Sequence, residues 1–499
     1  MSFLPIVQRE LRVSSRRKVT YYARSVVATI GMVMSFLFLF IGLVGGAKSG
    51  AGNFAFTVIS WYALLTTLLA GIFLASDSLS EERREGTLGL LFLTDLKGYD
   101  VVLGKFMAVS LNAFYGLLAV FPVLAISMMS GGVTGAEFWR TCLALINLLF
   151  FSVTGGMLIS SFCRSSMRSL SASVLLLVAW LVVTKSASVI GWYFLGNLSP
   201  FEAFLMASDA EYFRLSRDFW ISLGASHVMG WIFLGWASWR LRSFVDKGKS
   251  YERKKNFFTR NMLAGRAARR ARLLEINPVV WLLDDSQRLR WVARVLVLAA
   301  LIGIAVVMGK NGPMALYFLG YATWPFYFLL KIFVAIQACR FFVEARRTGA
   351  LELLCCTPLT MKDIMHGQWM LLRRVFLWPL IVLLLTHAAA LVYMSSQGDQ
   401  TGMPAGFGSF FFFWQFKVIP NNLADFFAIG WFGMWLAFSM ERPNLAAGVT
   451  ILSVIILPMI LMCVPTLVTD AIFICVGWVK LSEDFRLRQY EPLKTKAAT

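Results

Sequence analysis

Long, nearly uninterrupted apolar blocks are the feature that most constrains the fold of this chain. A helix of about 20 residues crosses the roughly 30 Å hydrocarbon core of a bilayer. Within lipid every backbone polar group needs a partner inside the chain, so these blocks are expected to be helical. Because 58% of the 499 residues are hydrophobic and only 15% are charged, a soluble fold would leave too much apolar surface in water.

The sequence therefore predicts an all-α, polytopic membrane protein with about twelve transmembrane helices. The predicted spans form two sets of six, so we expect a first six-span unit at 1–245, a basic linker at 246–276 and a second six-span unit at 277–499. The first set is 25–45, 54–76, 101–128, 138–162, 170–190 and 219–239; the second is 292–309, 314–339, 375–393, 424–440, 445–464 and 467–479.

The basic residues indicate the orientation. If the N-terminus is cytoplasmic, most of the 47 Lys and Arg residues fall in cytoplasmic segments, as the positive-inside rule requires. We expect a multi-pass protein of the bacterial cell (inner) membrane with both termini in the cytoplasm and an uncleaved first span. The stretch 240–272, with twelve basic and two acidic residues, favours contact with anionic membrane lipid over nucleic acid.

Two predicted cytoplasmic loops match each other. Segment 81–107 aligns without a gap on segment 344–370, and twelve of the 27 positions are identical. The identical pairs are Glu81–Glu344, Arg83–Arg346, Arg84–Arg347, Gly86–Gly349, Leu88–Leu351, Leu90–Leu353, Leu91–Leu354, Thr94–Thr357, Leu96–Leu359, Asp100–Asp363, Gly104–Gly367 and Met107–Met370. This match predicts two tandem repeats in parallel orientation.

Each matched loop opens with charged residues and continues with leucines. It is too short to span a membrane and too apolar for a free loop, so it predicts a short helix docked on another surface. The alternative is a tight turn packed on its own helices. Asp100 and Asp363 fall where the next helix needs an N-cap, and we expect them to serve as caps.

The loops resemble the first cytoplasmic loop of type 2 ATP-binding-cassette (ABC) exporter permeases, whose pattern is approximately E-x-x-x-G-T-L-E-L-L, then T/S-P, then G-K. The matching residues are Glu82, Gly86, Thr87, Leu88, Leu90, Leu91, Gly104 and Lys105 in the first loop and Gly349, Leu351, Glu352, Leu353, Leu354, Thr357 and Pro358 in the second. Departures are Asp95 in place of the proline, Ala350 in place of the threonine, and Gln368 in place of the lysine.

The resemblance implies that two permease units are fused in one chain that exports a substrate. Each loop would form a coupling helix on a cytoplasmic ABC ATPase subunit, of which two copies are expected. ATP would bind to that partner, and this chain would be a transport subunit, not an enzyme, with no cofactor of its own. The implied ATPase-coupling residues are Glu81, Glu82, Arg83, Arg84, Gly86, Leu88, Leu91, Glu344, Arg346, Arg347, Gly349, Leu351 and Leu354.

Ionisable residues inside predicted spans are costly and often functional. Lys331 is the clearest example, and the repeat pairs it with Leu68. Its alternative interpretation is a structural lysine bonded to a neighbouring carbonyl or carboxylate. Asp77 and Arg340 occupy equivalent positions, and we consider an ion pair between the repeats. Lys185, near the outer end of its span, can extend to the interface.

Two other functions compete with ATP-driven export. An ion- or proton-driven secondary transporter would also have repeats and charges at mid-membrane, but it leaves the paired loops unexplained. A membrane enzyme needs a converging set of acids, bases or metal ligands. His227, His366 and His387 have neither metal-ligand spacing nor a paired nucleophile, so the sequence predicts no catalytic residues and no metal site.

Overall fold

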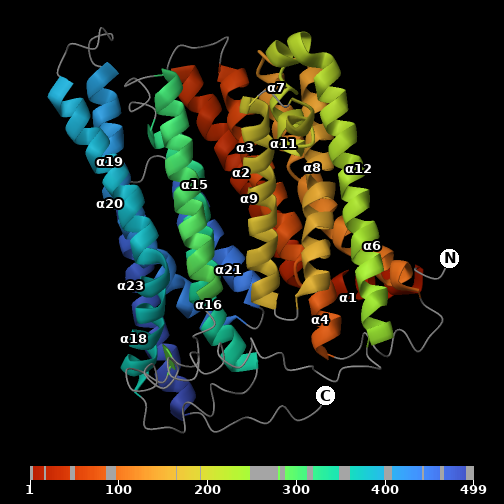
Figure 1. The fold of residues 1–499 in the computed structure, drawn as a ribbon, viewed down its shortest axis with the longest axis vertical. Helices are drawn as coiled ribbons and strands as arrows, with labels where there is room; N and C mark the ends of the chain where they lie inside the picture. Colours follow the sequence, from red (N-terminus) through yellow and green to blue (C-terminus); the bar gives the residue numbers. More distant parts are fainter. Residues whose placement is uncertain are drawn as a thin grey trace, which may run out of the picture. The chain divides into compact units, whose positions relative to one another are not determined.

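The computed structural model describes residues 4–15, 18–44, 51–85, 97–163, 166–190, 193–247, 279–280, 287–311, 319–347, 360–397, 407–440, 443–460 and 466–490. Every regular element within these ranges is a helix (Figure 1). The chain divides into two compact units, Met1–Glu252 and Arg253–Thr499. The division falls inside the predicted linker, most of which lies outside the described residues.

The first unit is built around one buried helix. Its helices are α1 (Leu4–Ser15), α2 (Lys18–Val44), α3 (Ala51–Ala75), α4 (Ser78–Glu85), α6 (Gly98–Leu118), α7 (Phe121–Met129), α8 (Gly135–Phe162), α9 (Ser166–Ile190), α10 (Tyr193–Gly196), α11 (Pro200–Leu205) and α12 (Asp209–Lys247). Helix α8 contacts α3, α6, α9 and α12, and it contributes the fully buried Leu145, Phe151 and Met157 to the core.

The second unit has an equivalent centre in α20. Its helices are α15 (Gln287–Asn311), α16 (Leu319–Arg347), α18 (Met361–Leu372), η2 (Arg373–Leu377), α19 (Trp378–Gln397), α20 (Phe407–Ser439), α21 (Pro443–Ile451), η4 (Leu452–Ile456), α22 (Leu457–Ile460) and α23 (Thr466–Tyr490). Helix α20 contacts α16, α19, α21 and α23. The segments η2 and η4 are π-helical turns, which are uncommon inside α-helices.

Five helical stretches of the described residues are long and apolar enough to cross a membrane: Gly52–Arg84, Gly98–Met129, Gly135–Phe162, Phe326–Ala345 and Lys362–Tyr393. They agree with five of the predicted spans and confirm a helical protein suited to a membrane. Helices also run through the other predicted stretches, some as shorter apolar segments such as Arg24–Leu37 and Leu445–Ile456. The count of twelve spans stays a prediction.

One detail of the loop prediction is wrong. Asp100 and Asp363 do not cap their helices, because the N-cap positions belong to Lys97 and Thr360. Each aspartate lies three residues later and accepts a hydrogen bond from the cap's backbone N–H, at 3.1 Å for Lys97 and 2.9 Å for Thr360. This is the reciprocal half of a capping box, so the carboxylates still stabilise both helix starts.

Candidate functional site

A cluster of four charged side chains joins the two arms of the first matched loop. Glu82 lies in α4, directly before the loop, and Lys105 lies in α6, after it; their carboxylate and amine are 2.7 Å apart. Glu10 of α1 lies 3.0 Å from Lys105, and Arg9 lies 3.1 Å from Glu82. Glu82 and Lys105 are each only 8% exposed. The cluster therefore ties three helices together at the entrance to the loop.

The cluster balances its own charge, with two carboxylates facing two cations. Burial alone would raise the pKa of Glu10, but the charges and hydrogen bonds of Lys105 and Arg9 outweigh it and hold that pKa below its ordinary value. Breaking such a pair leaves an uncompensated charge away from water. The ion pairs should therefore persist at neutral pH, and α4 and α6 should move together with α1.

The residues expected to dock on an ATPase fall partly within the described chain. Glu81 is exposed on α4, and Arg84 lies 3.5 Å from Asp77 on the preceding turn. Arg83 also takes part in an interaction of its own. The loop residues Gly86, Leu88 and Leu91 lie outside the described residues. Their docking stays a prediction.

The second loop begins differently. Arg340 and Glu344 form an ion pair one helical turn apart in α16, at 3.4 Å. The side chains of Arg346 and Arg347, and the loop residues Gly349, Leu351 and Leu354, lie outside the described part of the chain. After this loop, Gln368 occupies the position equivalent to Lys105, and its amide donates to the backbone carbonyls of Gln337 and Ala338.

The suggested pair between Asp77 and Arg340 stays a prediction. Asp77 accepts from the Ser80 hydroxyl at 2.6 Å and contacts Arg84, all within the first unit. Arg340 binds Glu344 within the second unit. Each residue thus has a local partner in its own unit.

A second charged cluster lies among the apolar helices of the second unit. Lys331 of α16 forms an ion pair and hydrogen bond with Asp425 of α20. Asp470 of α23 is fully buried and lies within electrostatic reach of both. The bond to Asp425 is the arrangement that the structural interpretation of Lys331 expects. A functional role for Lys331 stays a prediction, and the Lys185 side chain lies outside the described residues.

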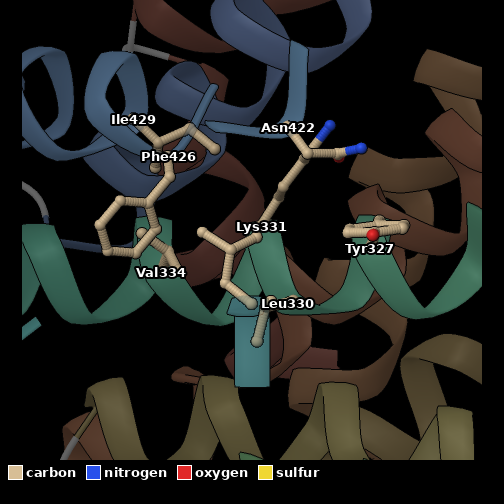
Figure 2. Close-up of a pocket in the computed structure, with 8 residues that line it drawn as sticks. Tyr327, Leu330, Lys331, Val334, Asn422, Phe426 and Ile429 are labelled. Carbon is tan, nitrogen blue, oxygen red and sulfur yellow. The ribbon is translucent and has the colours of Figure 1, made fainter. Parts of the chain in front are cut away.

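A small cavity of about 10 Å³ adjoins this cluster, enough space for roughly one water molecule. It is lined by Tyr327, Leu330, Lys331, Val334, Leu380, Asn422, Phe426 and Ile429. Figure 2 shows Lys331 extending from its helix toward Asn422, with Tyr327 one turn away. The Asn422 side-chain oxygen is buried without a hydrogen-bond partner in the described part of the chain. The cavity wall is thus apolar with a few polar groups.

A chain of polar groups continues from the cavity. The fully buried His387 of α19 contacts the Thr323 hydroxyl through Nε2 at 3.1 Å. Its Nδ1 contacts the Tyr327 hydroxyl at 3.2 Å and the Leu383 carbonyl at 3.1 Å. A carbonyl only accepts, so Nδ1 carries a proton that it donates to Leu383, while the Thr323 hydroxyl can donate to or accept from Nε2.

Sequence reasoning identified Lys331 but missed Asp425 and Asp470. Both are acidic residues inside predicted apolar spans, and the rule that singled out Lys331 applies to them equally. Within the described residues no group of three or more His, Cys, Asp or Glu side chains is arranged to hold a metal ion. Comparison of the sequence with protein-family models and with curated proteins gives no match.

Proposed function

We propose that this chain is the membrane-spanning permease of an ATP-driven ABC exporter, with two permease units in one polypeptide. Two copies of a separate cytoplasmic ATPase would bind ATP and seat on the two matched loops. The observation that carries the proposal is the loop match itself, 12 identities in 27 aligned positions. The charged opening, the glycine and the leucines that the two loops share also follow the pattern of coupling loops in that family.

The geometry around the first loop supports this role. A coupling element must transmit force from a partner to the membrane helices, so its arms need a stiff connection to them. The Glu82–Lys105 pair joins the two arms at 2.7 Å, and Glu10 adds the interfacial helix α1. A merely solvated loop would gain nothing from such a buried connection.

The test is to weaken docking without disturbing the membrane helices. Leu91→Asp and Leu354→Asp each replace an apolar side chain whose burial is worth about 1.5–3 kcal/mol. We expect each change to reduce ATPase co-purification and substrate-stimulated ATP hydrolysis by roughly tenfold or more. Unequal losses are expected, because Asp95 stands opposite Pro358 and Gly89 opposite Glu352 in the alignment.

The matched controls are Leu91→Met and Leu354→Met, which keep an apolar side chain of similar volume and should preserve docking. Membrane insertion should be normal in all four variants. Full co-purification and hydrolysis in the double aspartate variant would refute the coupling role. Recovery of the native chain with no ATPase, with transport unaffected by ATP depletion, would refute the proposed function.

The Lys331–Asp425–Asp470 cluster favours a second candidate, an ion- or proton-driven secondary transporter. Charged side chains among membrane helices mark ion pathways in such proteins. This candidate predicts transport that a protonophore abolishes and that ATP depletion leaves intact, the reverse of the outcome expected for the ABC permease.

A further inference from the structure

The charged cluster of the second unit does not balance its own charge. Asp425 and Asp470 bring two carboxylates, and Lys331 brings one ammonium. Asp425 is 8% exposed and Asp470 is 0% exposed. A fully ionised cluster would therefore hold a net negative charge away from water, which is strongly unfavourable.

No other described group nearby supplies the missing positive charge. The charged groups within electrostatic reach of Asp470 are Asp425 and Lys331. From α16, Tyr327 faces the cavity with a hydroxyl, and from α19, His387 bonds to Thr323, Tyr327 and Leu383. On α20 itself, Lys417 is exposed. The segments η4 and α22, which also contact α23, contain no titratable residue, and on α23 the charges of Lys480 and Glu483 face each other at 3.1 Å.

The two carboxylates differ in their partners. Asp425 accepts a hydrogen bond from the Lys331 ammonium. Both oxygens of Asp470 are buried and have no donor in the described part of the chain, although Asp425 is within reach of them. An ionised Asp470 would lose its hydration without gaining a hydrogen-bond donor from the described residues. A protonated Asp470 can instead donate a hydrogen bond to Asp425.

We propose that Asp425 and Asp470 form a proton-binding site, in which Asp470 holds one proton and donates it to Asp425, while Lys331 neutralises Asp425. The ligand is a single proton that binds the Asp470 carboxylate to give a carboxylic acid. The proposal does not depend on which energy source drives transport. The cavity beside Lys331 and Asn422, on the lysine side of the site, has room for about one water molecule.

A proton fits this site better than a metal ion. The Lys331 ammonium already occupies the cation position beside Asp425. Hard metal cations take about six or more oxygen ligands, whereas this cluster offers two carboxylates and the Asn422 oxygen. The rest of the cavity wall is apolar, with residues such as Leu330 and Phe426.

The test counts protonated carboxyl groups by infrared spectroscopy of the full chain in nanodiscs at neutral pH. Charge balance predicts one cluster carboxylic acid in the wild type and none in Asp470→Asn. Asp425→Asn should also show none, because Asp470 then ionises to pair with Lys331. Lys331→Met should show two, since no ammonium remains to neutralise a carboxylate.

The control is Glu483→Gln, which removes an exposed carboxylate from the same helix, α23, and should leave the carboxylic acid band unchanged. Asp470→Asn keeps the shape of the protonated acid, so it should fold and should unfold at the wild-type temperature at neutral pH. Raising the pH should lower the unfolding temperature of the wild type more than that of Asp470→Asn.

A neutral-pH carboxylic acid band that persists in Asp470→Asn would overturn the proposal. So would a band that disappears from the wild type when sodium chloride replaces choline chloride, since that would show a metal ion in place of the proton. Loss of ATPase coupling in the loop variants moves none of these bands, so failure of the proposed function and failure of the proton site are distinguishable.

Discussion

The loop alignment and its extended register pair residues of the two units that differ in charge. In the register that pairs Glu81 with Glu344, Lys105 of the first unit corresponds to Gln368 of the second, and Leu68 corresponds to Lys331. The first unit has a buried ion pair at the loop entrance, where Lys105 binds Glu82. The second has an ion pair among the apolar helices, where Lys331 binds Asp425. The matched loop sequences are therefore accompanied by different electrostatics in the two units.

Small-residue contacts extend this register to the central helices. Ala75 of α3 packs against Gly156 of α8, and Ala338 of α16 packs against Gly433 of α20. Extending the register of the loop alignment toward the N-terminus pairs Ala75 with Ala338, which predicts that the two glycines correspond. Two turns before each glycine, the first unit has Leu148 and the second has Asp425.

The small cavities of the two units differ in the same way, since one is lined mainly by apolar residues and the other includes Lys331. In the first unit, Leu68 and Leu148 line one small cavity together with Phe151 and Trp180. In the second, the corresponding residues are the ion pair Lys331–Asp425. Where α8 meets α12, the first unit has a neutral hydrogen bond from Asn147 to Ser226, at 2.7 Å. The second unit has the carboxyl groups of Asp425 and Asp470 on α20 and α23. We therefore expect that the ion pair of the second unit is not needed to build its fold.

The largest expected effect comes from breaking the second unit's ion pair. Lys331→Leu leaves Asp425 buried without its cation and should destabilise the protein by about 3 kcal/mol, the lower end for a broken buried pair because Asp425 can take up a proton. The double change Lys331→Leu with Asp425→Leu copies the first unit and should recover most of that loss. Chemical unfolding in detergent measures both. A double variant no more stable than the single one would contradict the comparison.

The loop entrances should respond unequally to the same substitution. Lys105→Met removes the nearer of the two cations from the buried Glu82, which keeps its contact with Arg9, and should cost about 2 kcal/mol. Gln368→Met should cost less, about 1 kcal/mol, because it removes neutral hydrogen bonds to the Gln337 and Ala338 carbonyls together with a side-chain oxygen that is already buried without a partner in the described part of the chain. Unfolding midpoints of the two variants decide the matter; equal losses would show that the ion pair adds no stability.

Much of the fold could be predicted because a helix that spans a membrane requires a long apolar stretch of sequence. The span predicted at 138–162 matches α8, Gly135–Phe162, almost to the residue. The span predicted at 424–440 lies largely within α20, which begins earlier, at Phe407. Lys417 and Pro420 interrupt the apolar pattern before the predicted span, and neither ends the helix.

The site was harder to predict because packing decides which charges meet. Lys331 stood out as a charge in an apolar block, but Asp425 lies 94 positions along the chain, and sequence spacing gives no contact between separate helices. The N-cap error has a similar cause. Asp is favoured at both the cap and the third position of a helix, and only backbone geometry shows that Lys97 and Thr360 precede Asp100 and Asp363 as the caps.

The smallest expected effect tests the correspondence of the two glycines. A methyl group added at Gly156 would approach the Ala75 side chain to 2.8 Å, closer than carbon atoms tolerate, so α3 and α8 must separate. Gly156→Ala should therefore cost about 1 kcal/mol through overpacking. At Gly433 the nearest side-chain atoms, in Ala338 and Thr450, lie at 3.4 Å, an ordinary van der Waals distance, and Gly433→Ala should fall within about 0.5 kcal/mol of the wild type. Adding Ala75→Gly to Gly156→Ala restores the missing space and should recover the loss, whereas Ala338→Gly should give Gly433→Ala no benefit. Unfolding midpoints of the four variants test this directly.

A larger loss at Gly433 than at Gly156 would mean that the two helix pairs are packed differently. The residue correspondence built on them, including Leu148 with Asp425, would then have to be abandoned.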